Sequence, residues 1–111
     1  MTEFEEVLLT QHMGPTIKAM ARIIWEGSTR RDGDQRWSEA EIWETKGGAW
    51  LVVNASVTDA SDKRDYDTVT VVDAFLPAWQ RETLAMGAMN GKSLAWKAKR
   101  ALKWDMVRDV A

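Results

Sequence analysis

The sequence predicts an α+β fold: an antiparallel meander of three or four strands with two C-terminal helices packed on one face. Two β-like runs meet at Gly47-Gly48, and paired glycines predict a hairpin because a two-residue turn needs positive φ angles. From residue 73 onward the apolar residues follow helical spacing instead of alternating. A chain of 111 residues can enclose one modest core, so we expect a single domain over residues 1–111.

The hairpin covers residues 36–58, and a two-residue turn decides which side chains share a face. We assign to the core the face that carries Ile42, Leu51, Val53, Ala55 and Val57. The opposite face then carries Trp37, Trp43, Trp50, Val52 and Met20. Helices can cover only one side of the sheet, so the second face is predicted to be a contiguous apolar patch rich in tryptophan. Patches of this kind mark interaction surfaces.

Residues 16–26 fit both a strand and a helix, because their apolar side chains satisfy either spacing. We choose a strand because the polar stretch 27–34 leads directly into the hairpin, which makes a meander the shortest connection. In that strand one face carries Ile17, Ala19, Ala21, Ile23 and Trp25. Pairing with the hairpin also places basic residues on the face of acidic ones, which is favourable across strands. The residues concerned are Lys18, Arg22, Glu39 and Glu41.

Beyond the hairpin, residues 59–67 are predicted as a polar loop and residues 68–72 as a short β-branched strand. Asp73 occupies the position of a helix N-cap. The first helix continues from there to an interruption at residues 87–91. Its predicted apolar face consists of Phe75, Leu76, Trp79, Thr83 and Met86.

The second helix is predicted from Lys92 or Ser93 to Val107, with Ser93 or Asn90 as its cap. Its apolar stripe consists of Leu94, Ala95, Ala98, Ala101, Leu102 and Met106. The opposite side carries Trp96 among basic residues, namely Lys97, Lys99, Arg100, Lys103 and Arg108. Such a face suits nucleic acid, an acidic groove on a partner protein, or plain solvation.

Three stretches carry a resemblance to a known family. They are Ile42-Trp43-Glu44-Thr45-Lys46-Gly47-Gly48, Ala49-Trp50-Leu51-Val52-Val53 and Thr68-Val69-Thr70-Val71-Val72-Asp73. In this order, and over residues 22–79, the chain resembles the EXLDI family of small actinobacterial proteins. It departs from the family near its C-terminus, where Trp104-Asp105-Met106 and Arg108-Asp109-Val110 differ from the Glu-x-Leu-Asp-Ile signature. The resemblance implies a fold and an actinobacterial or phage source, but no activity.

Composition argues against several classes of function. The chain has no cysteine and one histidine, His12, so thiolate chemistry is absent and a zinc site lacks ligands. The string Asn90-Gly91-Lys92-Ser93 lacks the upstream glycine of a phosphate-binding P-loop. We therefore expect no enzyme activity, no metal and no cofactor. Residues 1–9 are too acidic for a secretory signal and no stretch is long enough to span a membrane, so we expect a cytoplasmic protein.

The leading hypothesis is a small non-enzymatic interaction protein that contacts a protein partner through the tryptophan-rich sheet face. The contacts are assigned to Trp37, Trp43, Trp50 and Val52. The partner is a second copy of the chain, which gives a homodimer, or a foreign protein such as a host protein modulated by a phage. Residues 1–14, predicted as a short strand or a loose helix, offer a competing explanation if Phe4, Val7 and Leu8 fold over this face.

The alternative function is nucleic-acid association through the second predicted helix. The overall charge of −2 argues against a protein that coats nucleic acid in general, but a local basic patch is compatible with it. The contacts, to nucleic acid or to an acidic partner, are assigned to Trp96, Lys97, Arg100 and Lys103.

Overall fold

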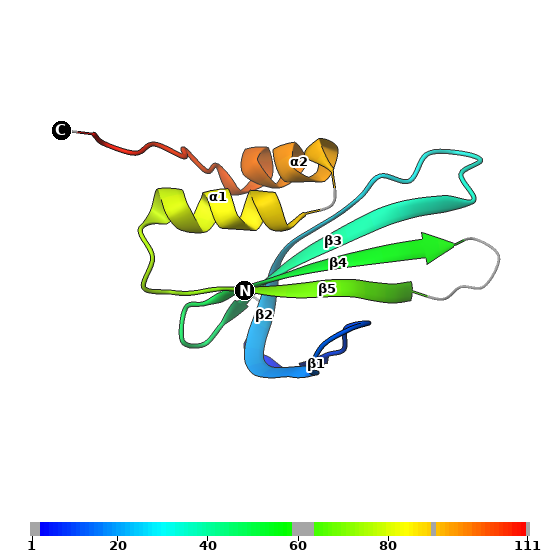
Figure 1. Cartoon of the computed structure of the whole chain (residues 1–111), viewed down its shortest axis with the longest axis horizontal. Coiled ribbons are helices and arrows are strands. Elements are labelled where there is room, and N and C mark those ends of the chain that lie inside the picture. Colours follow the sequence, from blue (N-terminus) through cyan, green and yellow to red (C-terminus); the bar gives the residue numbers. More distant parts are fainter. Residues whose placement is uncertain (1–2, 59–63, 90, 111) are drawn as a thin grey trace.

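The computed structural model describes residues 3–58, 64–89 and 91–110, with side chains throughout except at residues 64–67. Within these ranges it contains five strands and two helices (Figure 1). The strands are β1 (Glu5–Leu9), β2 (Ile17–Ser28), β3 (Arg36–Thr45), β4 (Trp50–Thr58) and β5 (Arg64–Val72). The helices are α1 (Ala78–Ala88) and α2 (Lys92–Leu102). The predicted α+β class is confirmed, and the strand number is corrected to five because β1 also pairs into the sheet.

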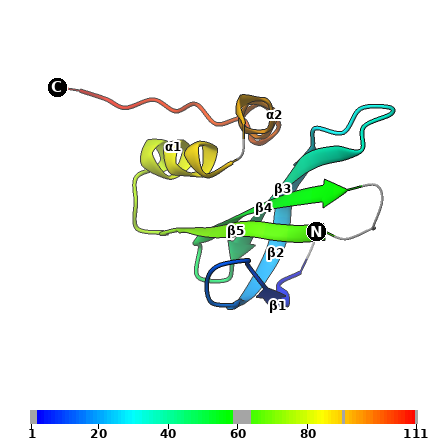
Figure 2. The ribbon, with the colours of Figure 1, turned by 45° about the vertical axis from the view of Figure 1, so that its right-hand side comes forward.

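The strands pair antiparallel in the order β1-β2-β3-β4-β5, and the sheet curls so that β1 returns beneath β5 (Figure 2). At this seam the Val69 N–H of β5 donates a hydrogen bond of 3.1 Å to Oε1 of Gln11, in the β1–β2 turn. Inside the curl, Leu9 and Val69 share a buried cluster with Leu51 and Val53. Both helices pack on the opposite side (Figure 1). The sheet therefore has an inner face inside the curl and an outer face under the helices.

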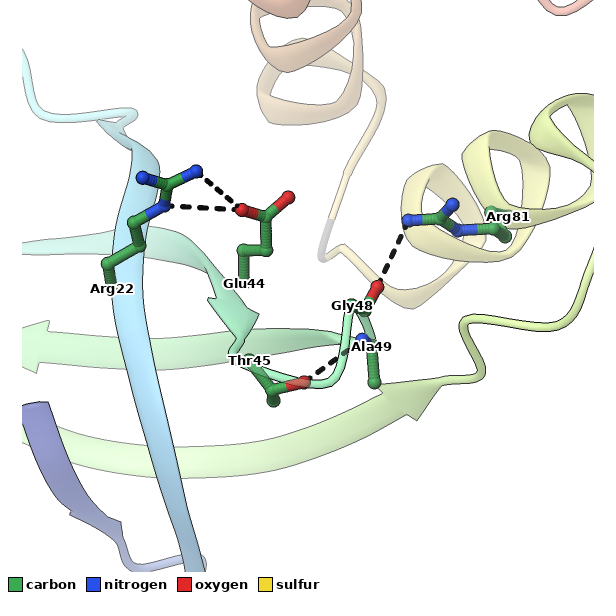
Figure 3. Close-up of polar contacts among 6 residues, drawn as sticks. All are labelled: Arg22, Glu44, Thr45, Gly48, Ala49 and Arg81. Carbon is green, nitrogen blue, oxygen red and sulfur yellow. Dashed lines mark hydrogen bonds and ion pairs between the residues drawn. The ribbon is translucent and has the colours of Figure 1, made fainter. Parts of the chain in front are cut away.

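The β3–β4 turn contains three residues, 46–48, instead of the two that were predicted. Thr45 closes it: its N–H donates to the Ala49 carbonyl at 2.8 Å, and its Oγ1 accepts from the Ala49 N–H at 3.0 Å (Figure 3). The Gly48 N–H donates to the Thr45 carbonyl at 2.9 Å, and Gly48 alone in this turn has a positive φ, +94°. The predicted register is wrong by one residue as a result, since Ile42 pairs with Val52.

This shift exchanges the faces of β4, because neighbouring side chains along a strand point to opposite sides. Trp50 and Val52, predicted on an exposed face, are buried with Ile42 on the outer face under the helices. Leu51 and Val53, predicted beside Ile42, lie on the inner face. The predicted core residues Ile42, Leu51, Val53 and Ala55 are all buried, but they belong to two faces instead of one.

The prediction that residues 16–26 form a strand is confirmed, and β2 contains a β-bulge that the sequence did not reveal. Ile23 pairs with Trp43, whereas Trp25 pairs with Ile42, so the pairing skips one residue between Ile23 and Trp25. Ile17 and Ala19 consequently pack inside the curl, and Trp25 packs on the outer face under the helices. The prediction that Trp25 shares a face with Ile17 is therefore wrong.

Ion pairs also differ from the expected ones. Arg22 binds Oε1 of Glu44, its cross-strand neighbour, through Nε at 3.2 Å and Nη2 at 2.8 Å (Figure 3). Lys18 lies 3.7 Å from the carboxylate of Glu6, on β1. The predicted pairing of Lys18 and Arg22 with Glu39 and Glu41 is wrong. The residues of β2 that pair with Glu41 and Glu39 are Glu26 and Ser28, near the C-terminal end of the strand.

Both helices start or end differently from the predictions. α1 begins at Ala78, and Pro77 occupies its N-cap position, so Asp73 is not the cap. Asp73 lies in the preceding turn, where its carbonyl accepts a hydrogen bond from the Leu76 N–H. Phe75, predicted on the apolar face, is 97% exposed. α2 ends at Leu102, before the predicted Val107, because Lys103 adopts a left-handed conformation with φ 56°.

The remaining boundaries shift for local reasons. α2 has Gly91 as its N-cap and no side-chain cap, so the predicted cap at Ser93 is wrong, while Asn90 lies outside the described residues. β5 begins at Arg64, within the stretch predicted as a polar loop, and residues 59–63 of that stretch also lie outside the described residues. In α2 the buried residues are Leu94, Ala95 and Ala98, whereas Ala101 of the predicted apolar stripe is exposed.

Trp50 joins the sheet to the helical layer. Its ring stacks on Trp104, which follows α2, with ring centroids 5.2 Å apart and an angle of 12°. The Arg81 guanidinium of α1 lies 4.2 Å from the Trp50 ring and donates to the Gly48 carbonyl at 3.2 Å (Figure 3). Asn54, also buried, donates from Nδ2 to the Ala88 carbonyl at the end of α1. Stacking, cation–π contact and a buried hydrogen bond thus fasten both helices to β4.

The two glycines of the β3–β4 turn allow a matched test. Gly48→Ala places a side chain at a φ of +94° and should lower the free energy of unfolding by about 1–2 kcal/mol. Gly47→Ala should change it little, because Gly47 lacks a positive φ and its nearest neighbour for a new Cβ is Thr45 Oγ1 at 3.9 Å. Urea unfolding of both variants measures the difference. Equal losses would show that the turn does not have this geometry.

The Trp50–Trp104 stack can be tested in the same way. Trp104→Ala should cost about 3–5 kcal/mol of stability, since it removes a buried indole and half of the stack. Trp96→Ala, on the exposed side of α2, should change stability by no more than about 0.5 kcal/mol. Thermal unfolding followed by far-UV circular dichroism compares them. A small effect of Trp104→Ala would contradict the role given to the stack.

Candidate interaction surfaces

Trp43 lies half-buried on the inner face of β3. It packs against the buried cluster of Leu9, Leu51, Val53 and Val69, and its Nε1 donates to Oε1 of Glu41 at 3.3 Å. Of the N-terminal residues expected to fold over this face, Val7 packs against the same cluster as Trp43, but Leu8 is exposed. Phe4 lies against Arg22 instead, with the guanidinium 4.7 Å from the centroid of the Phe4 ring. Cover of the tryptophans by the N-terminal segment therefore stays a prediction.

Trp37 lies on the same face as Trp43, nearer the opposite end of β3. The Arg30 guanidinium lies 4.2 Å from the centroid of the Trp37 ring. The indole Nε1 of Trp37 donates to Oε2 of Glu39 at 2.9 Å. A hollow of roughly 450 Å³ adjoins it, lined by Thr29, Arg36, Trp37, Ser38, Ser56, Val57 and Thr58. Of the predicted sheet-face surface, Trp37 and Trp43 thus remain together, while Trp50 and Val52 lie on the other side of the sheet.

The exposed side of α2 presents an aromatic side chain among basic ones. At about 100° per residue, Trp96 projects between Lys92 on one side and Arg100 and Lys97 on the other. All four are exposed, Trp96 to 54%, and the helix contains no acidic residue. Lys103, the C-cap residue, is exposed as well. All four residues predicted for this surface, Trp96, Lys97, Arg100 and Lys103, are therefore exposed on α2 or at its C-terminal end.

The β2–β3 loop extends the basic side of α2, as the sequence alone did not reveal. The Lys97 ammonium donates to the Ser28 carbonyl at 3.1 Å, at the end of β2. One hollow brings the two elements together and is lined by Thr29, Arg30, Arg31, Asp34, Ser93 and Lys97. Asp34 accepts a hydrogen bond of 2.8 Å from the Arg31 N–H. We call the exposed set Arg30, Arg31, Lys92, Lys97, Arg100 and Lys103 the basic surface.

A second hollow lies on the other side of Trp96, where α1 ends and α2 begins. Its volume is roughly 350 Å³, and it is lined by Met86, Gly87, Met89, Gly91, Lys92, Ala95 and Trp96. The Lys99 ammonium lies 4.7 Å from the centroid of the Trp96 ring. This apolar hollow is therefore bordered by an exposed aromatic ring and by lysines. We call it the interhelical hollow.

In residues 3–58, 64–89 and 91–110 no group of three or more His, Asp or Glu side chains is arranged to hold a metal ion. His12 is exposed in the β1–β2 turn. Neither helix of this part of the chain is long and apolar enough to cross a membrane.

Comparison of the chain with protein-family models, curated proteins and solved structures finds no match. The resemblance to the EXLDI family stays a prediction.

Proposed function

We propose that this protein binds nucleic acid through the basic surface. The observation that carries the proposal is the set of six exposed Lys and Arg side chains on α2 and the adjoining β2–β3 loop, with the exposed Trp96 on the same helix, in a chain whose net charge is −2. The rest of the molecule is correspondingly acidic. Such segregation orients a protein toward a polyanion and keeps its other sides away from it.

Trp96 favours nucleic acid over an acidic protein as the partner. Lysine and arginine meet phosphates, and an exposed indole offers a flat face on which a base can stack. The two basic elements are also far apart in the sequence, with Arg30 and Arg31 on a loop and Lys97 and Arg100 on α2. A basic surface wider than one helix suits the sugar–phosphate backbone of a nucleic acid, which carries negative charge along its whole length.

The proposal predicts binding that weakens steeply with salt. Fluorescence anisotropy with labelled single-stranded and duplex oligonucleotides, at two salt concentrations, measures it. The triple variant Lys97→Glu, Arg100→Glu, Lys103→Glu should abolish binding at low salt and remain folded, since all three side chains are exposed. If each of the three side chains contacts one phosphate of a single strand, replacing all three with neutral residues should make the plot of log affinity against log salt concentration less steep. The slope should change by about 2, at roughly 0.7 per phosphate.

A matched pair of single charge reversals controls for net charge. Arg100→Glu and Lys46→Glu make the same change at exposed positions, on α2 and in the β3–β4 turn respectively. Only Arg100→Glu should weaken binding. Absence of binding by the wild-type protein at low salt contradicts the proposal, and so do equal losses in the two variants. Displacement of the oligonucleotide by poly-glutamate at matched charge concentration would point to an acidic protein partner instead.

We propose protein contact through the inner face as the second candidate, favoured by the hollow beside Trp37. Trp50 and Val52 are excluded from this contact, because they lie under the helices. Trp43 is half-buried against the cluster inside the curl, so the contact is assigned to Trp37 and its neighbours on β4, which line the hollow. The partner is a second copy of the chain or a foreign protein.

Self-association through this surface predicts a mass of about twice 12.6 kDa in light scattering after size exclusion. Trp37→Glu should then give a folded species at the monomer mass, because a symmetric interface would receive the new charge twice. Trp96→Glu, on the opposite side of the sheet, serves as the control and should leave the dimer intact. A wild-type protein at the monomer mass excludes the homodimer.

A further inference from the structure

We propose that the nucleic acid bound by the basic surface is single-stranded, and that one unpaired base enters the interhelical hollow and stacks on Trp96. This inference rests on the proposed function and adds the kind of strand recognised. It is carried by the shape and lining of the interhelical hollow, by the exposure of Trp96, and by the position of the lysines around both.

The exposure of Trp96 is unusual in this molecule. All seven tryptophans lie in the described residues, and the other six are buried or half-buried. Trp50 and Trp104 stack on each other, and Trp25 packs under the helices. Trp96 is 54% exposed and contributes no comparable packing to the core. An exposed indole beside an apolar hollow is available to a ligand with a flat aromatic ring.

The interhelical hollow suits a base more than a charged or bulky group. Met86, Met89 and Ala95 are apolar, and methionine adapts to ring systems of different shape. A volume of roughly 350 Å³ accommodates one purine or pyrimidine ring. Most of the described lining side chains are apolar, which predicts little preference among the bases.

Charge around the interhelical hollow fits the rest of a nucleotide. Lys92 lines the hollow, and Lys99 lies against the Trp96 ring. Arg100 and Lys97 continue along the exposed side of α2 toward Arg30 and Arg31. A base in the hollow would therefore leave its sugar and phosphate at the start of a basic track. Bases of a duplex are paired and stacked on each other, so entry by one of them requires it to leave the stack.

Three probes of equal length separate base stacking from phosphate contact: a labelled thymidine oligonucleotide, its duplex with an adenosine strand, and an abasic strand. The wild-type protein should bind the single strand at least about fivefold more tightly than the abasic strand, since one stacked base is worth about 1–3 kcal/mol. Trp96→Ala should lower affinity for the single strand by about 5- to 100-fold, with Trp96→Phe retaining part of it. Affinity for the abasic strand should not change.

Two further variants complete the test. Gly87→Leu projects a side chain toward the interhelical hollow from a helical position where a new Cβ meets nothing within 4 Å, so it should fold and weaken single-strand binding. Phe75→Ala removes another exposed aromatic ring, away from the hollow lining, and should have no effect. Equal affinities for the three probes, unchanged by Trp96→Ala, overturn this inference and leave the proposed function standing. No binding of any probe at low salt overturns both.

Discussion

Gly48 holds a φ of +94°, and the three-residue turn that it closes decides which side chains of β3 and β4 face the helices. With this turn Ile42, Trp50 and Val52 form the floor on which α1 and α2 pack. With a turn one residue shorter, Leu51 and Val53 would lie there instead and Trp50 would point away from Trp104. Arg81 reinforces the choice from the helical layer, because it contacts both the Gly48 carbonyl and the Trp50 ring. Sheet register and helix docking therefore support each other.

Most tryptophans of the molecule lie against a cation. The pairs are Arg30 on Trp37, Arg81 on Trp50, Lys99 on Trp96 and Arg108 on Trp79. Such a contact covers part of an indole face while the charged group keeps access to water at the surface. At Trp50 the arrangement is structural, because the ring also stacks on Trp104 in the core. At Trp96 the same contact leaves more than half of the side chain exposed, which is why the proposed interaction centres there.

The elements that are specified by patterns within a few residues could be predicted from the sequence. Alternating apolar residues located β3 and β4, and helical spacing located α1 and α2. The register could not be predicted, because it depends on which of two adjacent glycines takes the positive φ and on a hydrogen bond to the Thr45 side chain. The bulge that moves Trp25 to the outer face has no local marker. For the candidate site, α2 was found from its own sequence, whereas the approach of Arg30 and Arg31 to Lys97 depends on tertiary packing.

Gln11 contacts the edge of the sheet at β5. An edge strand of β-branched residues, such as the Thr68–Val72 part of β5, offers unsatisfied amides to any passing strand and can seed aggregation. The Gln11 side chain occupies one of these amides, at Val69, and is held in position by its own Nε2, which donates to the Pro15 carbonyl at 2.9 Å. Gly14 makes room for it, since a Cβ there would lie 2.8 Å from the Gln11 side chain. A single amide side chain therefore satisfies one backbone N–H of the edge that the curl leaves open, so that a second strand could not pair with that N–H without displacing Gln11.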